Sequence, residues 1–386
     1  MPRKPSIVAA SFVTLAFLFF CAIPSSAQGG VRKHPPAAQD VDENNLGLRD
    51  GALVTSGASG QHMDRCVAGA PQPVFTAPSG EDTECVAISS NGDVLTAEMY
   101  SGKIYRIRPD GTATVIATLF PPGAYPNLLC VGVLLGRKGD LYVLANTWDP
   151  VTHGVWRVHS NGTFELYAAI PPAGSFLNGM TFDDRGNLFV TDSTLGAIWK
   201  VSRNREVQSW ISSDVLIWWG DPTGPFGANG IAYRDGMFYV AVTDAGYGLL
   251  PDERGSNYPV VTVPVLHDGS AGQPQVLLSD NLVLASDGLG LDRSGHLYVV
   301  DFGGLAWGPG FPNAGPAKLV RVRLDGTDED VVASAGLQNS ASVLIVGQTA
   351  YVTNLYVTDV PNIVKIDLCA NHHHHRWNSD SGDEGH

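Results

Sequence analysis

The sequence predicts an all-β fold, a six-bladed β-propeller with four-stranded antiparallel blades around a central channel. One motif recurs six times at intervals of roughly 50 residues, which is the period of a propeller blade. The 386 residues include 44 Gly and 25 Pro, a composition typical of short strands joined by many turns. No segment beyond the N-terminal region has a useful helical period, so a helical solenoid is excluded.

Each repeat predicts four strands. The first strand crosses several apolar or small residues and ends at a glycine turn, from which a second apolar strand returns. A loop then leads to a third strand, such as residues 154–158, and a turn such as Asn161-Gly162 precedes the fourth. The six first strands open on Glu84, Val131, Asn178, Asn229, Asp287 and Ala341.

Residues 1–27 have the pattern of a secretory signal peptide. Arg3 and Lys4 precede an apolar run, residues 7–23, and small residues allow cleavage after Ala27. A membrane anchor is the alternative, because the run is near the short limit for a span. We therefore expect a secreted or periplasmic protein with no membrane attachment after cleavage. Residues 28–71 would form a polar arm, residues 72–370 the propeller, and residues 371–386 a disordered acidic tail with His372 to His375.

Four cysteines follow the signal segment, and export would permit disulfides among them. Cys66 precedes the first repeat and Cys369 ends the last, so a Cys66–Cys369 bridge would tie the two ends of the propeller. Cys85 and Cys130 lie at the start of neighbouring inner strands and could form a second pair. Free buried thiols are the alternative.

The residues that open the six first strands form one aligned column, which would make a ring around the channel. Four of them carry side-chain oxygens, namely Glu84, Asn178, Asn229 and Asp287. Carboxylate and amide oxygens suit Ca²⁺, whereas the absence of His and Cys from the column disfavours zinc and copper. The alternative is that these residues cap turns, since Asn-Gly is a common turn pair.

These repeats and this column resemble the senescence marker protein/gluconolactonase/LRE-like family, also called regucalcin-like, which is related to paraoxonases and diisopropyl-fluorophosphatase. The resemblance covers roughly residues 72–370. It implies that Glu84, Asn178, Asn229 and Asp287 hold a catalytic calcium ion, with Asn178 also facing the substrate. Sugar-acid lactonases of the family carry an Arg where this chain has Phe176, and paraoxonases an Asn where it has Gly288. The resemblance therefore implies a more apolar ester or lactone than a hydroxyl-rich aldonolactone.

Aromatic residues gather in the loops expected on the same face as the column. Trp148 and His153 belong to blade 2, Trp218 and Trp219 precede Asn229, and Trp307 follows the second strand of blade 5. They predict an apolar wall of a substrate pocket, although packing between loops is an equal alternative. His153 could also serve as a general acid or base. The second strands end in another polar column, which we expect to brace turns: Glu98, Asn146, Asp192, Asp244, Asp301 and Asn354.

The sequence thus predicts a calcium-dependent hydrolase of a small lactone or ester. The calcium ion would act as a Lewis acid, and Asp287 would activate water or attack the carbonyl directly. The net charge of −14 argues against a nucleic-acid partner, and we expect a monomer. The alternatives are a phosphotriesterase at the same site, a secreted binding propeller with structural calcium, and a scaffold that binds partner proteins.

Overall fold

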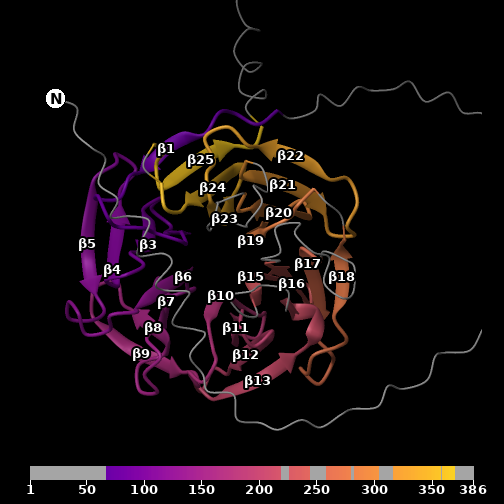
Figure 1. Cartoon of the computed structure of the whole chain (residues 1–386), viewed down its shortest axis with the longest axis horizontal. Coiled ribbons are helices and arrows are strands. Elements are labelled where there is room, and N and C mark those ends of the chain that lie inside the picture. Colours follow the sequence, from indigo (N-terminus) through magenta and orange to yellow (C-terminus); the bar gives the residue numbers. More distant parts are fainter. Residues whose placement is uncertain are drawn as a thin grey trace, which may run out of the picture.

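Six antiparallel sheets surround a central channel in the computed structural model (Figure 1), which describes residues 67–218, 226–243, 258–279, 282–303, 316–357 and 359–369. The predicted all-β six-bladed propeller is confirmed. The inner strands β6, β10, β15, β19 and β23 lie nearest the centre of Figure 1. Across the described ranges, no helix is long and apolar enough to cross a membrane.

The blades follow the chain in order, and each is a meander of antiparallel strands. Blade 1 contains β2 (Ala87–Ile88), β3 (Val94–Ala97), β4 (Lys103–Ile107) and β5 (Ala113–Thr118). Blade 2 contains β6 (Leu129–Leu135), β7 (Leu141–Asn146), β8 (Gly154–Val158) and β9 (Phe164–Ala169). Blade 3 contains β10 (Leu177–Phe182), β11 (Leu188–Asp192), β12 (Ala197–Val201) and β13 (Val207–Ser212).

Blade 4 has one additional short strand. A 3₁₀ turn η2 (Asp214–Leu216) leads into β14 (Ile217–Trp218), which pairs with the inner strand. The other strands of blade 4 are β15 (Phe226–Arg234), β16 (Met237–Val242), β17 (Val260–Pro264) and β18 (Gln275–Leu278). Blade 5 contains β19 (Ser286–Leu291), β20 (His296–Asp301), β21 (Lys318–Arg323) and β22 (Asp330–Ala333).

Blade 6 joins the two ends of the propeller. Its strands β23 (Ser340–Val346), β24 (Thr349–Asn354) and β25 (Ile363–Asp367) come from the last repeat, and its outer strand β1 (Gln72–Phe75) comes from before the first. The pairing of β1 with β25 closes the ring. The Thr353 hydroxyl of blade 6 also donates to the Glu84 carbonyl of blade 1. Closure therefore fixes the position of Glu84 in the channel.

The predicted disulfide clasp concerns the same junction. Cys369 is buried just after β25. Cys66 lies outside the described residues, as do the predicted signal segment and the C-terminal tail. The Cys66–Cys369 pairing therefore stays a prediction.

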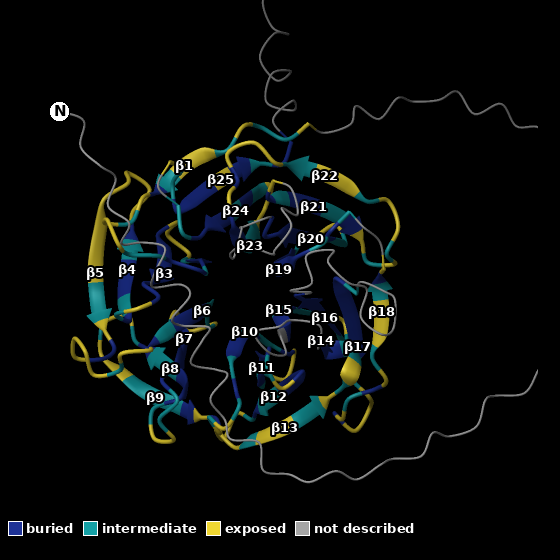
Figure 2. Ribbon diagram, in the orientation of Figure 1, coloured by how far each residue is buried: buried dark blue, intermediate teal, exposed yellow. Residues whose placement is uncertain are grey.

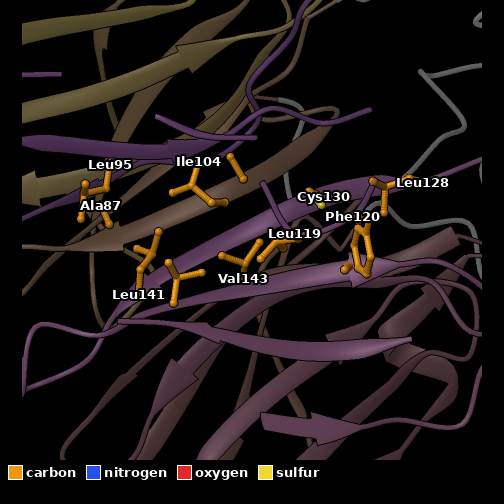
Figure 3. Close-up of a cluster of buried hydrophobic side chains, with 12 residues drawn as sticks. Ala87, Leu95, Ile104, Leu119, Phe120, Leu128, Cys130, Leu141 and Val143 are labelled. Carbon is orange, nitrogen blue, oxygen red and sulfur yellow. The ribbon is translucent and has the colours of Figure 1, made fainter. Parts of the chain in front are cut away.

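The hydrophobic core lies between neighbouring blades. A buried apolar cluster fills each of the six contacts between adjacent blades in the described structure. Figure 3 shows the cluster between blades 1 and 2, where Ile104 and Leu119 of blade 1 meet Leu141 and Val143 of blade 2. The second strands β7 and β11 are buried along their whole length, whereas outer strands such as β5 and β13 are partly exposed and partly yellow in Figure 2. The blades thus hold one another in place and fix where the inner strands stand.

The suggested Cys85–Cys130 disulfide is wrong, since both thiols are free. Cys85 follows the aligned ring position of its blade and lines the channel, where its thiol donates to the Val131 carbonyl at 2.8 Å. Cys130 precedes the ring position of the next blade and is buried in the cluster between blades 1 and 2. The two side chains therefore occupy different compartments.

A glycine follows the aligned residue in four of the six inner strands because the next strand approaches its backbone closely. A Cβ atom at Gly179 would lie 2.5 Å from the Asn229 carbonyl oxygen, and one at Gly230 would lie 2.7 Å from that of Asp287. Gly132 and Gly288 show the same close approach to the next blade. These pairs lie inside β6, β10, β15 and β19, so the alternative that Asn-Gly marks a turn here is wrong.

Replacing Gly179 with alanine is expected to lower the free energy of unfolding by about 1–3 kcal/mol, because its Cβ would meet backbone that cannot rotate away. Gly290→Ala, on another inner strand, is a milder control, since its Cβ would lie 3.1 Å from the nearest atom. Urea unfolding of both variants tests the expectation. Equal stability of the two variants would contradict it.

Candidate metal centre in the channel

The four predicted polar residues come together in the channel, and we call Glu84, Asn178, Asn229 and Asp287 the polar ring. They are only 4–8% exposed. Glu84, Asn178 and Asn229 line one cavity, and the Asn229 amide donates to the Asp287 carboxylate. Asp287 in turn interacts electrostatically with Glu84. The structure thus brings together side chains that lie up to about 200 residues apart in the sequence.

A β-bulge places three of these side chains. The register with the second strand shifts between Leu177 and Met180, between Ala228 and Ile231, and between Ser286 and Leu289. Each shift spans the ring residue and its glycine. A bulge leaves residues without a regular partner and redirects their side chains, so the ring residues turn toward the axis of the channel.

Hydroxyl groups that directly follow the second strands orient the two ring amides. Asn178 Nδ2 donates to Ser193 Oγ at 3.3 Å, and Asn229 Nδ2 donates to Thr243 Oγ1 at 2.9 Å. Each hydroxyl donates in turn to a carbonyl of the next blade. Because both amide nitrogens are held in this way, the amide oxygens are left to serve as ligands.

Burial disfavours the charged form of both ring carboxylates. Burial raises the pKa of Glu84 well above its usual range, and the nearby Asp287 raises it further. Burial also raises the pKa of Asp287 well above its usual range, against a smaller opposing effect of the Asn229 hydrogen bond. Asp287 Oδ1 is buried and has no hydrogen-bond partner among the described residues. A divalent cation would neutralise both carboxylates and give this oxygen a partner.

The donor set fits a hard cation rather than a soft one. It offers two carboxylates and two amides, the oxygen ligands that Ca²⁺ prefers, and no nitrogen or sulfur ligand. Within the described ranges, no group of three or more His, Cys, Asp or Glu side chains could hold a metal ion. A metal at the polar ring would therefore depend on both amides, with open positions for water or a substrate oxygen.

The channel holds a cavity of about 380 Å³, lined by the inner strands of all six blades. It extends from the polar ring toward the face where the inner hairpins turn, which we call the turn face. On the opposite side, which we call the mouth face, lies an apolar cluster with Met99, Val131, Phe302 and Leu355 buried and Phe176 packed against it. The polar ring thus lies between the channel cavity on one side and the apolar mouth-face cluster on the other.

Three predicted pocket residues of blades 2 and 3 differ in how deeply they are buried. Phe176 is partly buried beside the mouth-face cluster, and Trp148 is partly buried and donates from Nε1 to the Ser175 carbonyl. His153 is fully buried instead, and burial lowers its pKa to about 4. Its Nδ1 accepts a hydrogen bond from the Trp148 amide. His153 therefore braces the loop that carries Trp148.

The side chains of the other predicted aromatic residues lie outside the described part of the structure. Trp218 forms part of β14 and pairs with Phe226 in register, but its side chain is outside the described part. Trp219 and Trp307 also lie outside the described residues. The aromatic pocket wall thus stays a prediction for this part of the mouth face.

The second polar column is structural, as expected, at each of its described members. Asp192 accepts hydrogen bonds from Ser175 Oγ at 2.6 Å and from the Phe176 amide at 3.0 Å. It thereby anchors the segment that leads into Asn178. Asn146, Asp301 and Asn354 are likewise fully buried and bonded to the chain before an inner strand. Asp244 lies outside the described residues.

Two tyrosines at the mouth face were missed from the sequence. The Tyr100 and Tyr356 hydroxyls are hydrogen-bonded to each other, and both interact electrostatically with Glu84. Tyr356 has a φ of 52°, a left-handed conformation that a bulky residue rarely adopts. Its amide donates to Asp82 Oδ1 at 3.0 Å, which holds this conformation. Each tyrosine lies just after the end of a second strand. This shared position in the repeat is the sequence signal that could have identified them.

The comparisons with known proteins support the fold. No protein-family model matches the sequence, and no curated protein matches it. Among solved structures, a gluconolactonase from Xanthomonas campestris is 13% identical over 78% of this chain and 98% of its own, with a TM-score of 0.52. A proposed gluconolactonase is 15% identical over 80% of this chain and 96% of its own, also at 0.52. Virginiamycin B lyase from Staphylococcus aureus is 16% identical over 74% and 80%, at 0.48.

Proposed function

We propose that this chain is a secreted or periplasmic, calcium-dependent hydrolase that acts as a monomer on a small apolar lactone or ester. The observation that carries the proposal is the polar ring, where two buried carboxylates and two oriented amides converge and Asp287 Oδ1 lacks a partner. Glu84, Asn178, Asn229 and Asp287 would hold the calcium ion. Gluconolactonase-like propellers among the solved structures of similar fold support the same reaction class.

The ring residues have distinct roles in this proposal. Calcium bound here would supply Lewis-acid stabilisation of charge on the carbonyl oxygen. Asp287 would take a proton from the attacking water or attack the carbonyl carbon itself. Coordination lowers the basicity of a carboxylate, whereas the burial of Asp287 raises its pKa and opposes that loss. Asn178, held by Ser193, would position the substrate.

The surroundings of the ring favour an apolar substrate. Phe176 stands two residues before Asn178 and packs against the mouth-face cluster. No Lys, Arg or His is among the described residues that line the channel cavity beside the ring. A substrate with a hydrocarbon chain or aromatic leaving group would bury apolar surface here, whereas a polyhydroxylated lactone would lose hydrogen bonds to water. One hydroxyl of the Tyr100–Tyr356 pair would keep its proton free to donate to a substrate oxygen.

The test is hydrolysis of a panel by the metal-stripped protein before and after calcium is added. The panel contains an alkyl-substituted lactone, an aldonolactone, an aryl ester and a phosphotriester. We expect turnover only with calcium, and faster turnover of the alkyl lactone or aryl ester than of the aldonolactone. Bound calcium without turnover of any substrate would contradict the enzymatic proposal and favour a binding propeller. Preference for the phosphotriester would contradict the substrate class.

A further inference from the structure

A second cavity lies on the turn face, between blades 2 and 3, remote from the mouth-face cluster. Its volume is about 470 Å³. It is lined by the hairpin turns β6–β7, β10–β11 and β12–β13, and by residues of the strands β7, β8, β9 and β10. We call this cavity the basic cavity, because six cationic side chains line it: Arg137, Lys138, Arg157, Arg185, Arg203 and Arg205.

The positive charge of this cavity contrasts with the negative net charge of the whole chain. The chain has 24 Lys and Arg residues and a net charge of −14, yet a quarter of these cations line one cavity. Only two carboxylates, Asp140 and Asp184, line it as well. Focusing of like charges in a concave site raises the local concentration of oppositely charged ligands. The field of this cavity therefore favours an anion.

Four of the cations are available to a ligand. Arg137, Lys138, Arg185 and Arg203 form no ion pair with any described residue, and all four are exposed. The other two are held in place. Arg205 Nη2 pairs with Glu165 Oε1 at 3.0 Å, and Arg157 pairs with the same carboxylate. Both guanidinium groups lie over the Tyr167 ring, at 5.0 Å and 5.7 Å from its centroid.

Arg157 has a donor that the described structure does not use. Its Nε is buried and has no hydrogen-bond partner among the described residues. A buried donor without an acceptor costs free energy, and a bound oxyanion would supply the acceptor. Because a guanidinium group presents its donors as a rigid fork, it suits a phosphate or sulfate group.

Arg205 stands where other blades have glycine. In the turn between the third and fourth strands, the residues at the equivalent hydrogen-bonded position are Gly111, Gly162, Gly269 and Gly326, with φ between 79° and 84°. Arg205 adopts a φ of 67° at this position, which is strained for an arginine. Strain of this kind is concentrated at functional sites, and here it places a cation at the cavity.

An aromatic wall completes the cavity. The rings of Tyr142, Tyr167 and Phe182 pack edge to face, with centroids 5.0 Å and 5.2 Å apart. All three line the cavity. They offer apolar contact to the part of a ligand that carries the charged groups, such as a sugar ring.

We propose that the basic cavity binds a small ligand with two or more phosphate or sulfate groups. Arg185 and Arg203 would contact the anionic groups first, Arg157 and Arg205 would hold them from a fixed position, and the aromatic wall would contact the carbon skeleton. This site is separate from the polar ring and does not depend on the proposed hydrolase activity.

The test is calorimetric titration of the calcium-free protein with pyrophosphate and with a trisulfated disaccharide, at about 50 mM salt. Absence of calcium prevents precipitation of the probes and separates this site from the polar ring. We expect binding that weakens when salt is raised to about 200 mM, because salt screens exposed charges. The probe that binds more tightly identifies the source of the oxyanion. Failure of both probes to bind at low salt would overturn the proposal.

Two sets of variants test the named residues. Arg185→Ala with Arg203→Ala should weaken binding about tenfold or more. Arg108→Ala with Arg323→Ala removes the same charge from turns of blades 1 and 5 and should leave the affinity within about twofold. Arg205→Gly should weaken binding while the melting temperature stays equal or rises, which excludes unfolding as the cause. Equal losses in both double variants, or unchanged binding by Arg205→Gly, would overturn the proposal.

Discussion

Replacing Asp287 with asparagine is expected to abolish calcium-dependent turnover, with a loss of about 10²–10⁴-fold, while the propeller stays folded. The change keeps the shape of the side chain but removes one of the two ring carboxylates and the proposed base or nucleophile. It also relieves the burial of a charge beside Glu84, so the metal-free variant should melt at an equal or higher temperature. Turnover, bound calcium and melting temperature are to be measured on the same sample.

Asp235→Asn is a matched control for this variant. Its carboxylate is 89% exposed in the β15–β16 turn of blade 4, and it contacts only Arg234 among the described residues. The same chemical change there should leave turnover and calcium binding unaltered. If Asp287→Asn kept full activity with calcium bound, the assigned role of Asp287 would be wrong. If the variant bound calcium normally but lost turnover, Asp287 would act in chemistry without being needed as a ligand.

Calcium is expected to reverse the pH dependence of stability. In the metal-free protein the pKa values of Glu84 and Asp287 are raised above their unfolded values, so the folded state binds more protons. Stability then falls as pH rises from the unfolded pKa toward the folded pKa. With calcium bound, protons compete with the metal, so stability rises with pH over the same window. At a calcium concentration of 100 times Kd, the stabilisation is about 2.7 kcal/mol.

Melting temperatures from about pH 5 to pH 8, in metal-free buffer and with calcium, check this reversal. A Glu84→Gln/Asp287→Asn variant serves as the control, because it keeps all other titrating groups. In this variant the two curves should coincide. Parallel curves for the wild-type protein with and without calcium would contradict the placement of the metal between these carboxylates.

The repeat length of the blades and the residue types of the polar ring could be predicted from the sequence, because both depend on local patterns. Each blade repeats its own hairpin, and turns such as Gly92 and Gly295, with φ of 86° and 89°, need glycine wherever the chain folds. Alignment on those turns was enough to place Glu84, Asn178, Asn229 and Asp287 in one column. The structure confirms their convergence, and the calcium ion remains a proposal.

Contacts between residues of different blades could not be predicted from such patterns. Cys85 and Cys130 looked equivalent because both open inner strands, but they flank the ring position from opposite sides. His153 looked like a loop residue, but its burial behind Trp148 depends on packing between blades 2 and 3. A turn was the alternative interpretation of the Asn-Gly pairs, since only the next blade shows why Gly179 and Gly230 must lack a Cβ.

The sequence by itself determined the all-β class, the blade period and the residue types around the channel, because strand alternation and turn chemistry act over a few residues. Only the tertiary structure decided how the ring closes, since β1 joins β25 from the far end of the chain. It also decided that hydroxyls just after the second strands orient Asn178 and Asn229, and that six cations meet in one cavity. These arrangements arise between segments distant in sequence, where contact depends on how whole blades pack.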